Sequence, residues 1–314
     1  MKNIKELKIS SVIACYKDEQ SIPLMHQRLT KTFKEIGCKY EIIFVNDGSP
    51  DNSEKVLENI CKNDKNTIAI IHSRNFNSQN SFSSGMHYAT GDAVVLLDGD
   101  LQDPPELIKD FSDKWIEGYD VVYGSRVKRE TSKFMNISYK FFYRIFNKLS
   151  YINIPLDAGD FSLMDRKVVN SINSLKESDR FIRGLRAWTG FKQIGVPYNR
   201  PERQFGVSTN NLFKNIQWAK KGIFSFSHLP LEIMSLISYL IFLLSSIALI
   251  IYIILYFLKD EAPRGITTLI VLVLFLGGMQ LLSLSILSEY ISKILDETKK
   301  RPYSIIKKII NKKD

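Results

Sequence analysis

The chain has 314 residues, 45% of them apolar and 24% charged, an average composition that fits one large globular domain and a smaller part. The formal net charge is +10, from 43 lysines and arginines against 33 aspartates and glutamates. Basic residues cluster beside two apolar segments near the C-terminus, where attraction to anionic lipid accounts for most of the excess, so the charge gives no reason to expect a nucleic-acid partner.

The N-terminal part alternates short apolar runs with helical patterns. Strands are predicted at 9–15, 40–45, 68–72, 93–97 and 119–124. Helices are predicted at 21–37, from the end of the turn at 46–51 to about 63, at 79–90 and at 105–118. The first of these has an apolar face of Ile22, Met25, Leu29 and Phe33. This alternation is typical of an α/β domain with a mostly parallel sheet wound by right-handed crossovers.

Polar residues follow several of these strands. Asp18, Asp47, Asp98, Asp100 and Arg126 all come at or just after the carboxyl end of a predicted strand. In an open α/β sheet the carboxyl ends of the strands form one edge, and ligands bind beyond it. We therefore expect these side chains to lie within reach of one extended ligand.

The stretch 94–106, V-V-L-L-D-G-D-L-Q-D-P-P-E, is the most informative of these turns. Asp98 and Asp100 flank Gly99, which permits a sharp turn and a close approach of a ligand to the backbone. Two carboxylates in this position can hold a hard cation. An Asp-x-Asp pair taken alone also occurs in ordinary solvated turns.

Several other motifs are missing from the sequence. There is no GxGxxG after the first strand and no GxxxxGK[ST], so dinucleotide binding and simple NTPase activity have little support. The three cysteines lack CxxC spacing and are predicted to be free thiols, and the four histidines show no metal-binding spacing, so we assign them no catalytic or metal role. The first residues lack the apolar core of a cleavable signal peptide.

Two long uncharged segments, 233–258 and 265–288, each exceed the ~20 residues that a helix needs to cross a bilayer. They could be buried core helices, but two in succession with only six residues between them favour a transmembrane hairpin. Lysines and arginines precede the first segment and follow the second, whereas Lys259 and Arg264 between them are offset by two acids. The positive-inside rule then places the N-terminal domain and the C-terminus on the cytoplasmic side of the inner membrane.

Amphipathic segments adjoin the hairpin. The segment at about 134–150 and the helix expected at 211–228 combine aromatic and aliphatic residues with lysines, and the basic tail 291–314 repeats this theme in 303–313. Each could pack on a protein core, but beside a hairpin we expect them at the lipid headgroups. The predicted organisation is a domain over 1–210, an interfacial helix over 211–228, a hairpin over 229–290 and the tail.

Six motifs together carry a family resemblance: A-C-Y-K-D-E at 14–19, V-N-D-G-S-P-D-N-S at 45–53, D-G-D-L-Q-D-P-P at 98–105, G-S-R at 124–126, D-A-G-D-F-S-L at 157–163 and R-P-E-R-Q-F-G at 200–206. They resemble the family 2 glycosyltransferases of GT-A fold. The later motifs resemble the polyprenyl-phosphate hexosyltransferase branch, which includes dolichyl-phosphate mannose synthases and GtrB-type enzymes. The resemblance covers nearly the whole chain and includes the two spans.

The resemblance implies inverting transfer of a hexose, glucose or an N-acetylhexosamine, from a UDP-sugar to undecaprenyl phosphate at the cytoplasmic membrane face. It further implies a homo-oligomer. The residues it assigns to the nucleotide sugar are Ala14, Tyr16, Asp18, Asp47 and Asp98. Those it assigns to Mg²⁺ or Mn²⁺ are Asp98, Asp100 and Gln102. To the acceptor phosphate it assigns Arg126, Lys133, Arg200 and Arg203. The catalytic carboxylates that it implies are Asp100 and either Asp157 or Asp160, which would orient the acceptor or act as a base.

The chain departs from the family pattern at two places. Ala14, Lys17 and Asp18 stand where Pro-x-Tyr-Asn-Glu is usual, and Thr209 stands where a lysine usually follows the serine, with Lys214 as a possible substitute. Two alternatives remain. A processive polysaccharide synthase would carry Q-x-x-R-W, which 183–188, R-G-L-R-A-W, does not match. A non-catalytic membrane scaffold could keep the fold, although the Asp98, Asp100 and Gln102 set argues against it.

Overall fold

The computed structural model describes residues 3–126, 155, 158–205, 227–258 and 265–311. The amphipathic segment at 134–150, nearly all of the interfacial helix expected at 211–228, and the side chains of Lys133, Asp157 and Lys214 lie outside the described residues.

The described part of the chain forms an eight-stranded sheet in the order β7-β5-β6-β4-β1-β2-β3-β8. Its strands are β1 (Lys8–Cys15), β2 (Lys39–Asn46), β3 (Thr67–His72), β4 (Ala93–Asp98), β5 (Val121–Arg126), β6 (Ala158–Asp165), β7 (Gln193–Tyr198) and β8 (Ile306–Ile310). The pairs β1–β2, β1–β4, β2–β3 and β5–β7 are parallel, and only β6 and β8 pair antiparallel. The mostly parallel sheet predicted from the alternation of elements is confirmed.

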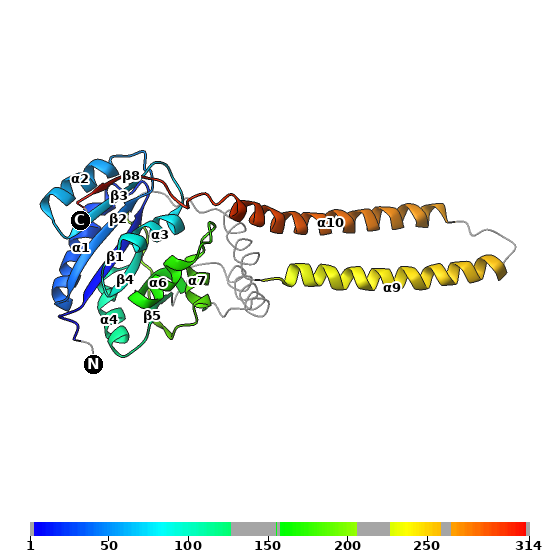
Figure 1. The fold of residues 1–314 in the computed structure, drawn as a ribbon, viewed down its shortest axis with the longest axis horizontal. Helices are drawn as coiled ribbons and strands as arrows, with labels where there is room; N and C mark the ends of the chain where they lie inside the picture. Colours follow the sequence, from blue (N-terminus) through cyan, green and yellow to red (C-terminus); the bar gives the residue numbers. More distant parts are fainter. Residues whose placement is uncertain (1–2, 127–154, 156–157, 206–226, 259–264, 312–314) are drawn as a thin grey trace.

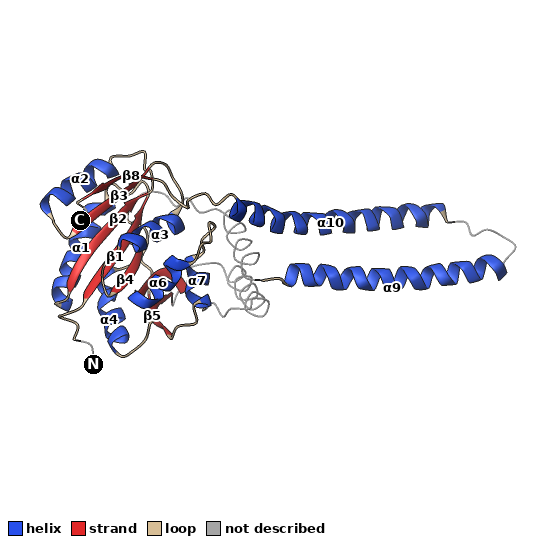
Figure 2. Ribbon diagram, viewed as in Figure 1, coloured by secondary structure: helices blue, strands red, loops and turns tan. Residues whose placement is uncertain are grey.

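Helices cover both faces of the sheet (Figure 2). They are α1 (Ser21–Ile36), α2 (Ser53–Asn63), α3 (Ser78–Tyr88), α4 (Ile108–Ile116, after the 3₁₀ turn η1, Pro105–Leu107), α6 (Arg166–Ser174) and α7 (Ile182–Trp188). Helices α1, α2 and α4 contribute to one buried apolar cluster and α3, α6 and α7 to another. Because both faces are covered, the central strands bury nearly every side chain and read as continuous apolar runs such as V-V-L-L in β4.

The C-terminal tail corrects one expectation. Residues 306–310 do not form an amphipathic interfacial segment; they form β8, which pairs antiparallel with β3 at the edge of the sheet (Figure 1). Ile310 packs on one core cluster, and Ile306 and Ile309 on the other. An unpaired edge on β3 would expose backbone donors and acceptors, and the isoleucine pairs of the tail cover it on both faces.

Two long helices, α9 (Leu229–Leu258) and α10 (Ile266–Thr298), run side by side away from the sheet (Figure 1). Their apolar windows have mean hydropathies of 2.0 and 1.7, and almost none of either window is buried. Phe242 and Leu281 are more than two-thirds exposed. Buried core helices are thereby excluded for these segments, and both are long and apolar enough to cross a membrane.

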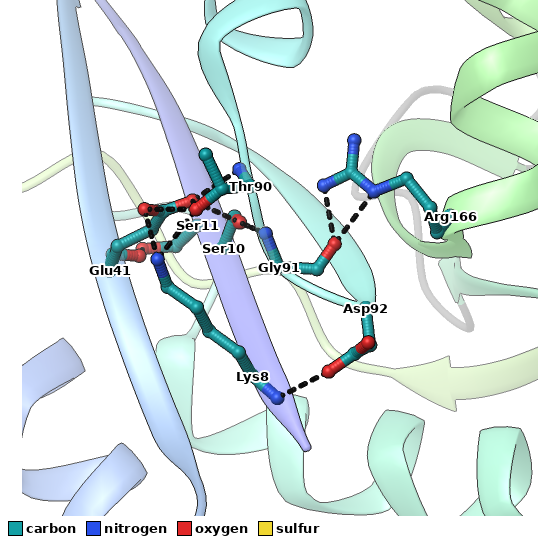
Figure 3. A network of polar contacts seen from close by, with 8 residues as sticks. All are labelled: Lys8, Ser10, Ser11, Glu41, Thr90, Gly91, Asp92 and Arg166. Atoms are coloured by element: carbon teal, nitrogen blue, oxygen red, sulfur yellow. Dashed lines mark hydrogen bonds and ion pairs between the residues drawn. The ribbon is translucent and has the colours of Figure 1, made fainter. Parts of the chain in front are cut away.

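A buried polar network joins the sheet to the loop before β4, at the end of the sheet where β1 and β4 begin (Figure 3). The carboxylate of Glu41 accepts hydrogen bonds from Lys8 Nζ at 2.6 Å, Ser10 Oγ at 2.6 Å and the Thr90 amide at 2.6 Å. Burial raises the pKa of Glu41, but these donors outweigh it and leave the pKa below its ordinary value. The carboxylate therefore stabilises the fold in its ionised form.

We expect Glu41→Gln to destabilise the full-length protein by about 2 kcal/mol, because an amide NH₂ would face the donors of Lys8 and Thr90. The melting temperature should fall by roughly 4–8 °C at neutral pH. Since the folded pKa of Glu41 is depressed, its contribution is present above the unfolded pKa of about 4.3 and is lost as the pH falls through the folded value. The difference between wild type and variant should therefore shrink in acid.

Glu35→Gln is the matched control, because its side chain is 58% exposed and its partner Lys31 lies 3.9 Å away. Such an exposed pair contributes about 0.5 kcal/mol or less. Equal melting temperatures for the two variants at neutral pH would contradict a stabilising role for the network.

Candidate functional site

The acidic turns that follow β1 and β4 meet at the carboxyl edge of the sheet. The last residue pair of the β1–β4 ladder is Ala14 with Asp98, and the Gly99 amide then donates to the Ala14 carbonyl at 2.9 Å. A Cβ on Gly99 would stand 3.0 Å from Ala14 O, Cys15 Sγ and Asp18 Oδ2. Glycine at this position lets the two turns approach this closely without displacing these atoms.

The segment after β7 lies across the Asp-x-Asp turn. Arg200 Nη2 is 3.8 Å from one carboxylate oxygen of Asp98 and 3.8 Å from one of Asp100. Gln102 donates its side-chain amide to the Pro201 carbonyl at 3.1 Å, and Arg203 Nη2 lies 3.2 Å from Asp18 Oδ1. Arg200 and Arg203, which the resemblance assigned to the acceptor phosphate, are thus paired with the carboxylates assigned to the nucleotide sugar and metal.

Negative charge is concentrated at this edge. Burial raises the pKa of Asp98 to about 8, and the adjacent carboxylates of Asp103 and Asp100 add to the rise. Burial also raises the pKa of Asp18 to about 6, although the Tyr16 amide and Arg203 favour its ionised form. These carboxyls therefore need cations nearby in order to remain ionised together at neutral pH.

The chemistry of the donor set fits a divalent cation. No group of three His, Cys, Asp or Glu side chains within the described residues is already arranged around a metal position. Asp98 and Asp100 nevertheless converge on one positive group, the Arg200 guanidinium, and Gln102 lies beside them, with its backbone N–H donating to Asp100 Oδ1 at 3.1 Å. Oxygen ligands of this kind suit Mg²⁺ or Mn²⁺.

Asp47 occupies a buried position at the end of the β2 strand. Its Oδ1 lies 2.9 Å from Nδ1 of His72 and accepts the Phe76 amide at 2.8 Å. His72 Nε2 is 2.9 Å from the hydroxyl of Ser84, which in turn lies 2.8 Å from that of Ser304. His72 therefore fixes Asp47, a role that histidine spacing in the sequence could not reveal.

Strand β6 brings further polar residues to the same edge. Its antiparallel register against β4 pairs Leu96 with Ser162, and continuing it places Asp160 opposite Asp98. Asp160 accepts two hydrogen bonds from Arg183, at 2.9 and 3.1 Å, and one from Gln79 at 3.0 Å. Burial raises the pKa of Asp160, but Arg183 and its neighbours bring it below the ordinary value.

A second arginine of α7, Arg186, is 1% exposed. Its guanidinium carbon lies 5.3 Å from the centroid of the Tyr123 ring, and Nη1 is 3.5 Å from the Gly159 carbonyl. Burial lowers the pKa of Arg186 to about 10, so it is cationic at neutral pH. Arg183 and Arg186 were not predicted as site residues, because the stretch 183–188 does not match the Q-x-x-R-W motif of a processive polysaccharide synthase and was assigned no other role.

The edge thus brings together most of the residues that the resemblance names. Ala14, Asp18, Asp98, Asp100, Gln102, Arg200 and Arg203 form one group. Tyr16 lies in the same turn and is 36% exposed, Asp47 lies on the β2 side, and Arg126 and Asp160 lie on the β5–β6 side.

Comparisons with known proteins find related glycosyltransferases. The model of "Glycosyl transferase family 2" matches residues 10–172. The uncharacterized glycosyltransferase YkcC of Bacillus subtilis (strain 168) is 41% identical over 97% of this chain and 94% of its own length. A prophage bactoprenol glucosyl transferase homolog of Escherichia coli (strain K12) is 36% identical over 96% of this chain and 99% of its own.

Among solved structures, glucosyl-3-phosphoglycerate synthase from Mycobacterium tuberculosis in complex with Mn²⁺ and UDP-Glc is similar with a TM-score of 0.47 and 15% identity, covering 69% of this chain and 77% of that one.

Gly48, next to Asp47, offers a test of how tightly this site is built. Its φ is +62°, and a Cβ there would stand 2.6 Å from Arg74 Cα and 2.8 Å from the Asn75 amide nitrogen. Because the Phe76 amide that binds Asp47 follows directly, we expect Gly48→Ala to lower stability by roughly 3 kcal/mol and to disturb Asp47. Thermal melting of the full-length protein measures this.

Gly37→Ala is the control, since Gly37 has a φ of +75° but nothing within 4 Å of an added Cβ. Backbone strain alone should lower stability there by about 1 kcal/mol. If both variants melt at the same temperature, the close packing around Gly48 has no energetic consequence.

Proposed function

Because this chain belongs to glycosyl transferase family 2, we propose that it transfers a hexose from a UDP-sugar to a polyprenyl phosphate at a membrane surface. The chain is a glycosyltransferase, and the mostly parallel sheet is the GT-A arrangement expected from the sequence. The observation that carries the proposal is that one chain combines an acidic sheet edge with two membrane-length helices. Relatives of nearly the same length that are named bactoprenol glucosyl transferase support a lipid acceptor.

The donor's uracil would lie between the β1 and β2 ends. Both side-chain hydrogen bonds of Asp47 within the described residues use Oδ1, which leaves Oδ2 to accept a hydrogen bond from an imide N–H. Tyr16 presents a partly exposed aromatic face, and Asp18 lies next to it, with Oδ2 accepting the Tyr16 amide at 2.9 Å. Together these groups would select and orient the base and ribose.

The donor's diphosphate would lie over the Asp-x-Asp turn. Asp98, Asp100 and Gln102 would hold Mg²⁺ or Mn²⁺, and the bound ion would offset charge on the departing UDP. Arg200, which lies on Asp98 and Asp100, and Arg203, which lies on Asp18, are placed to contact phosphate oxygens of the donor. We therefore assign them to the donor rather than to the acceptor.

The acceptor phosphate is anionic at neutral pH, so positioning and charge contribute more to the reaction than proton removal does. Asp160 would be a poor base, because Arg183 and Gln79 hold it in its ionised, hydrogen-bonded form. We assign it to fixing Arg183 at the edge. Attack from the face opposite UDP would invert the anomeric carbon.

The helices α9 and α10 would anchor the enzyme in the inner membrane, with the domain and the C-terminus on the cytoplasmic side. The basic residues that flank the two spans support this sidedness. The strand β8, which follows α10 and pairs with β3, also supports it, because the tail and the domain must then lie on one side.

Transfer of radiolabelled sugar from a panel of UDP-sugars to undecaprenyl phosphate, in detergent and with or without Mn²⁺, tests the proposal. We expect lipid-linked label that requires the ion and falls by roughly a hundredfold or more in Asp100→Ala, because removal of a metal ligand removes charge stabilisation of the leaving group. Glu106→Ala, next to the turn but paired with Arg28, should keep its activity. Absence of lipid label with every donor, despite binding of UDP, would favour the scaffold alternative.

The His72–Asp47 contact gives a second prediction. We expect His72→Ala to raise the Kd for UDP roughly tenfold, because Asp47 would lose the group that holds it in place. Isothermal titration of the full-length protein with UDP measures this. His87→Ala is the control, since His87 is an exposed histidine on α3 whose ring packs against Tyr88. Equal Kd values for both variants would remove His72 from the nucleotide site.

A further inference from the structure

Arg186 stands out among the buried groups because two of its three side-chain nitrogens, Nε and Nη2, have no hydrogen-bond partner within the described residues. Arg186 is 1% exposed, so bulk solvent does not reach these donors. A buried guanidinium with unused donors is costly to a fold unless an anion arrives with a ligand. The contacts that Arg186 does make, to the Tyr123 ring and weakly to the Gly159 carbonyl, do not use these donors.

Arg126, at the end of β5, approaches Gly159 of β6, the residue whose carbonyl lies near Arg186. A Cβ built on Gly159 would lie 3.2 Å from Arg126 Nη2, and Arg126 Nε likewise has no hydrogen-bond partner within the described residues. Strand β5 and helix α7 thus bring two guanidiniums to one glycine. A side chain at 159 would occupy the space next to Arg126.

The carboxylates that attract these two arginines are already engaged by other groups. Asp103, which attracts Arg126, accepts a hydrogen bond from Tyr198, and Asp160 is bonded twice by Arg183. Arg186 is attracted by Asp160 but repelled by Arg183. A phosphate monoester, with a charge of about −1.5 to −2 at neutral pH and three acceptor oxygens, matches two guanidiniums with unused N–H groups.

The position of the two arginines distinguishes the acceptor from the donor. Arg200 and Arg203 lie on the carboxylates of the donor side, whereas Arg126 and Arg186 lie across Gly159, beyond β4 on the β5–β6 side. The loop before α7 is bonded to α10, where Glu297 accepts the Ser178 amide at 2.9 Å and Lys293 lies 2.6 Å from Asp179. Helix α7 is therefore on the part of the domain that adjoins the membrane helices (Figure 1).

From these observations we propose that Arg186 and Arg126, on either side of Gly159, bind the phosphate monoester of the lipid acceptor. The inference rests on the proposed function and extends it by naming an arginine of α7 as an acceptor-binding residue. The guanidiniums would hold two phosphate oxygens and leave the third free to attack the anomeric carbon, where the new C–O bond forms as the bond to the UDP oxygen breaks and UDP leaves. Asp160 would act as a positioning residue through Arg183.

The test uses the full-length protein in detergent, with farnesyl monophosphate as acceptor and the UDP-sugar that the donor panel identifies. In Arg186→Gln we expect the KM for farnesyl monophosphate to rise roughly tenfold to a hundredfold, with the KM for the UDP-sugar within about twofold of wild type. For Arg186→Lys we expect a KM for farnesyl monophosphate between those of wild type and Arg186→Gln, because an ammonium keeps the charge but not the bidentate geometry.

Arg180→Gln is the matched control. Arg180 is also a buried arginine beside α7, at 3% exposure, but it donates to the Leu175 carbonyl at 2.5 Å and packs on the Tyr303 ring. Its loss should lower thermal stability and leave the KM for farnesyl monophosphate unchanged. If Arg186→Gln does not fold, the Lys variant carries the test, and an unchanged acceptor KM in that variant overturns the proposal.

A binding measurement separates this inference from the proposed function. Farnesyl monophosphate should raise the melting temperature of wild type more than farnesol does, and Arg186→Gln should abolish the difference. If that holds while wild type transfers no sugar, the phosphate site stands and the proposed function fails. If wild type transfers sugar and Arg186→Gln changes only the KM for the donor, the anion at Arg186 belongs to UDP and the inference is wrong.

Discussion

The structure depends on the balance of charge at the carboxyl edge of its sheet. Parallel strands that end in aspartates bring like charges into one partly desolvated place, and such carboxylates cannot all remain ionised without cations close by. Asp18, Asp98 and Asp100 are balanced here by Arg203 and Arg200, which come from a segment about a hundred residues or more further along the chain. The same arrangement explains how the segment after β7 is held over the turn and why a divalent cation with an anionic donor would fit there.

The antiparallel strand β6 extends this edge, and a second group of side chains, mainly positively charged arginines, lies around it. It pairs between β4 and β5, so that its first residues lie beside the last residues of β4. Around it are guanidiniums, with Arg183 on Asp160 and Arg126 and Arg186 near Gly159. An acidic half and a basic half therefore adjoin one another. This separation suits a reaction between a metal-bound diphosphate and an anionic nucleophile, because each reactant is held by the opposite charge.

Helix α10 and the segment that follows it are both bonded to the domain. Glu297 and Lys293 of α10 contact the loop that precedes α7. Beyond α10, Ser304 reaches Ser84, which contacts His72 and through it Asp47, and β8 then closes the edge of the sheet. The C-terminal segment is thus part of the domain, and the position of the hairpin is set by side-chain contacts as well as by chain connectivity.

The sequence by itself determined the first five strands, the helices between them and the two long apolar helices, because each is specified by local periodicity and by turn residues such as Gly37, which ends α1 with a φ of +75°. It also pointed to Asp98 and Asp100 as candidate metal ligands, since their spacing is local, and the family resemblance added Gln102. Only the tertiary structure decided what depends on contacts distant in sequence: the pairing of β8 with β3, the contact of His72 with Asp47, the pairing of Arg200 with Asp98 and of Arg203 with Asp18, and the burial of Arg186. Burial and long-range pairing set the charge and the role of these side chains. A linear motif contains no information on either burial or long-range pairing.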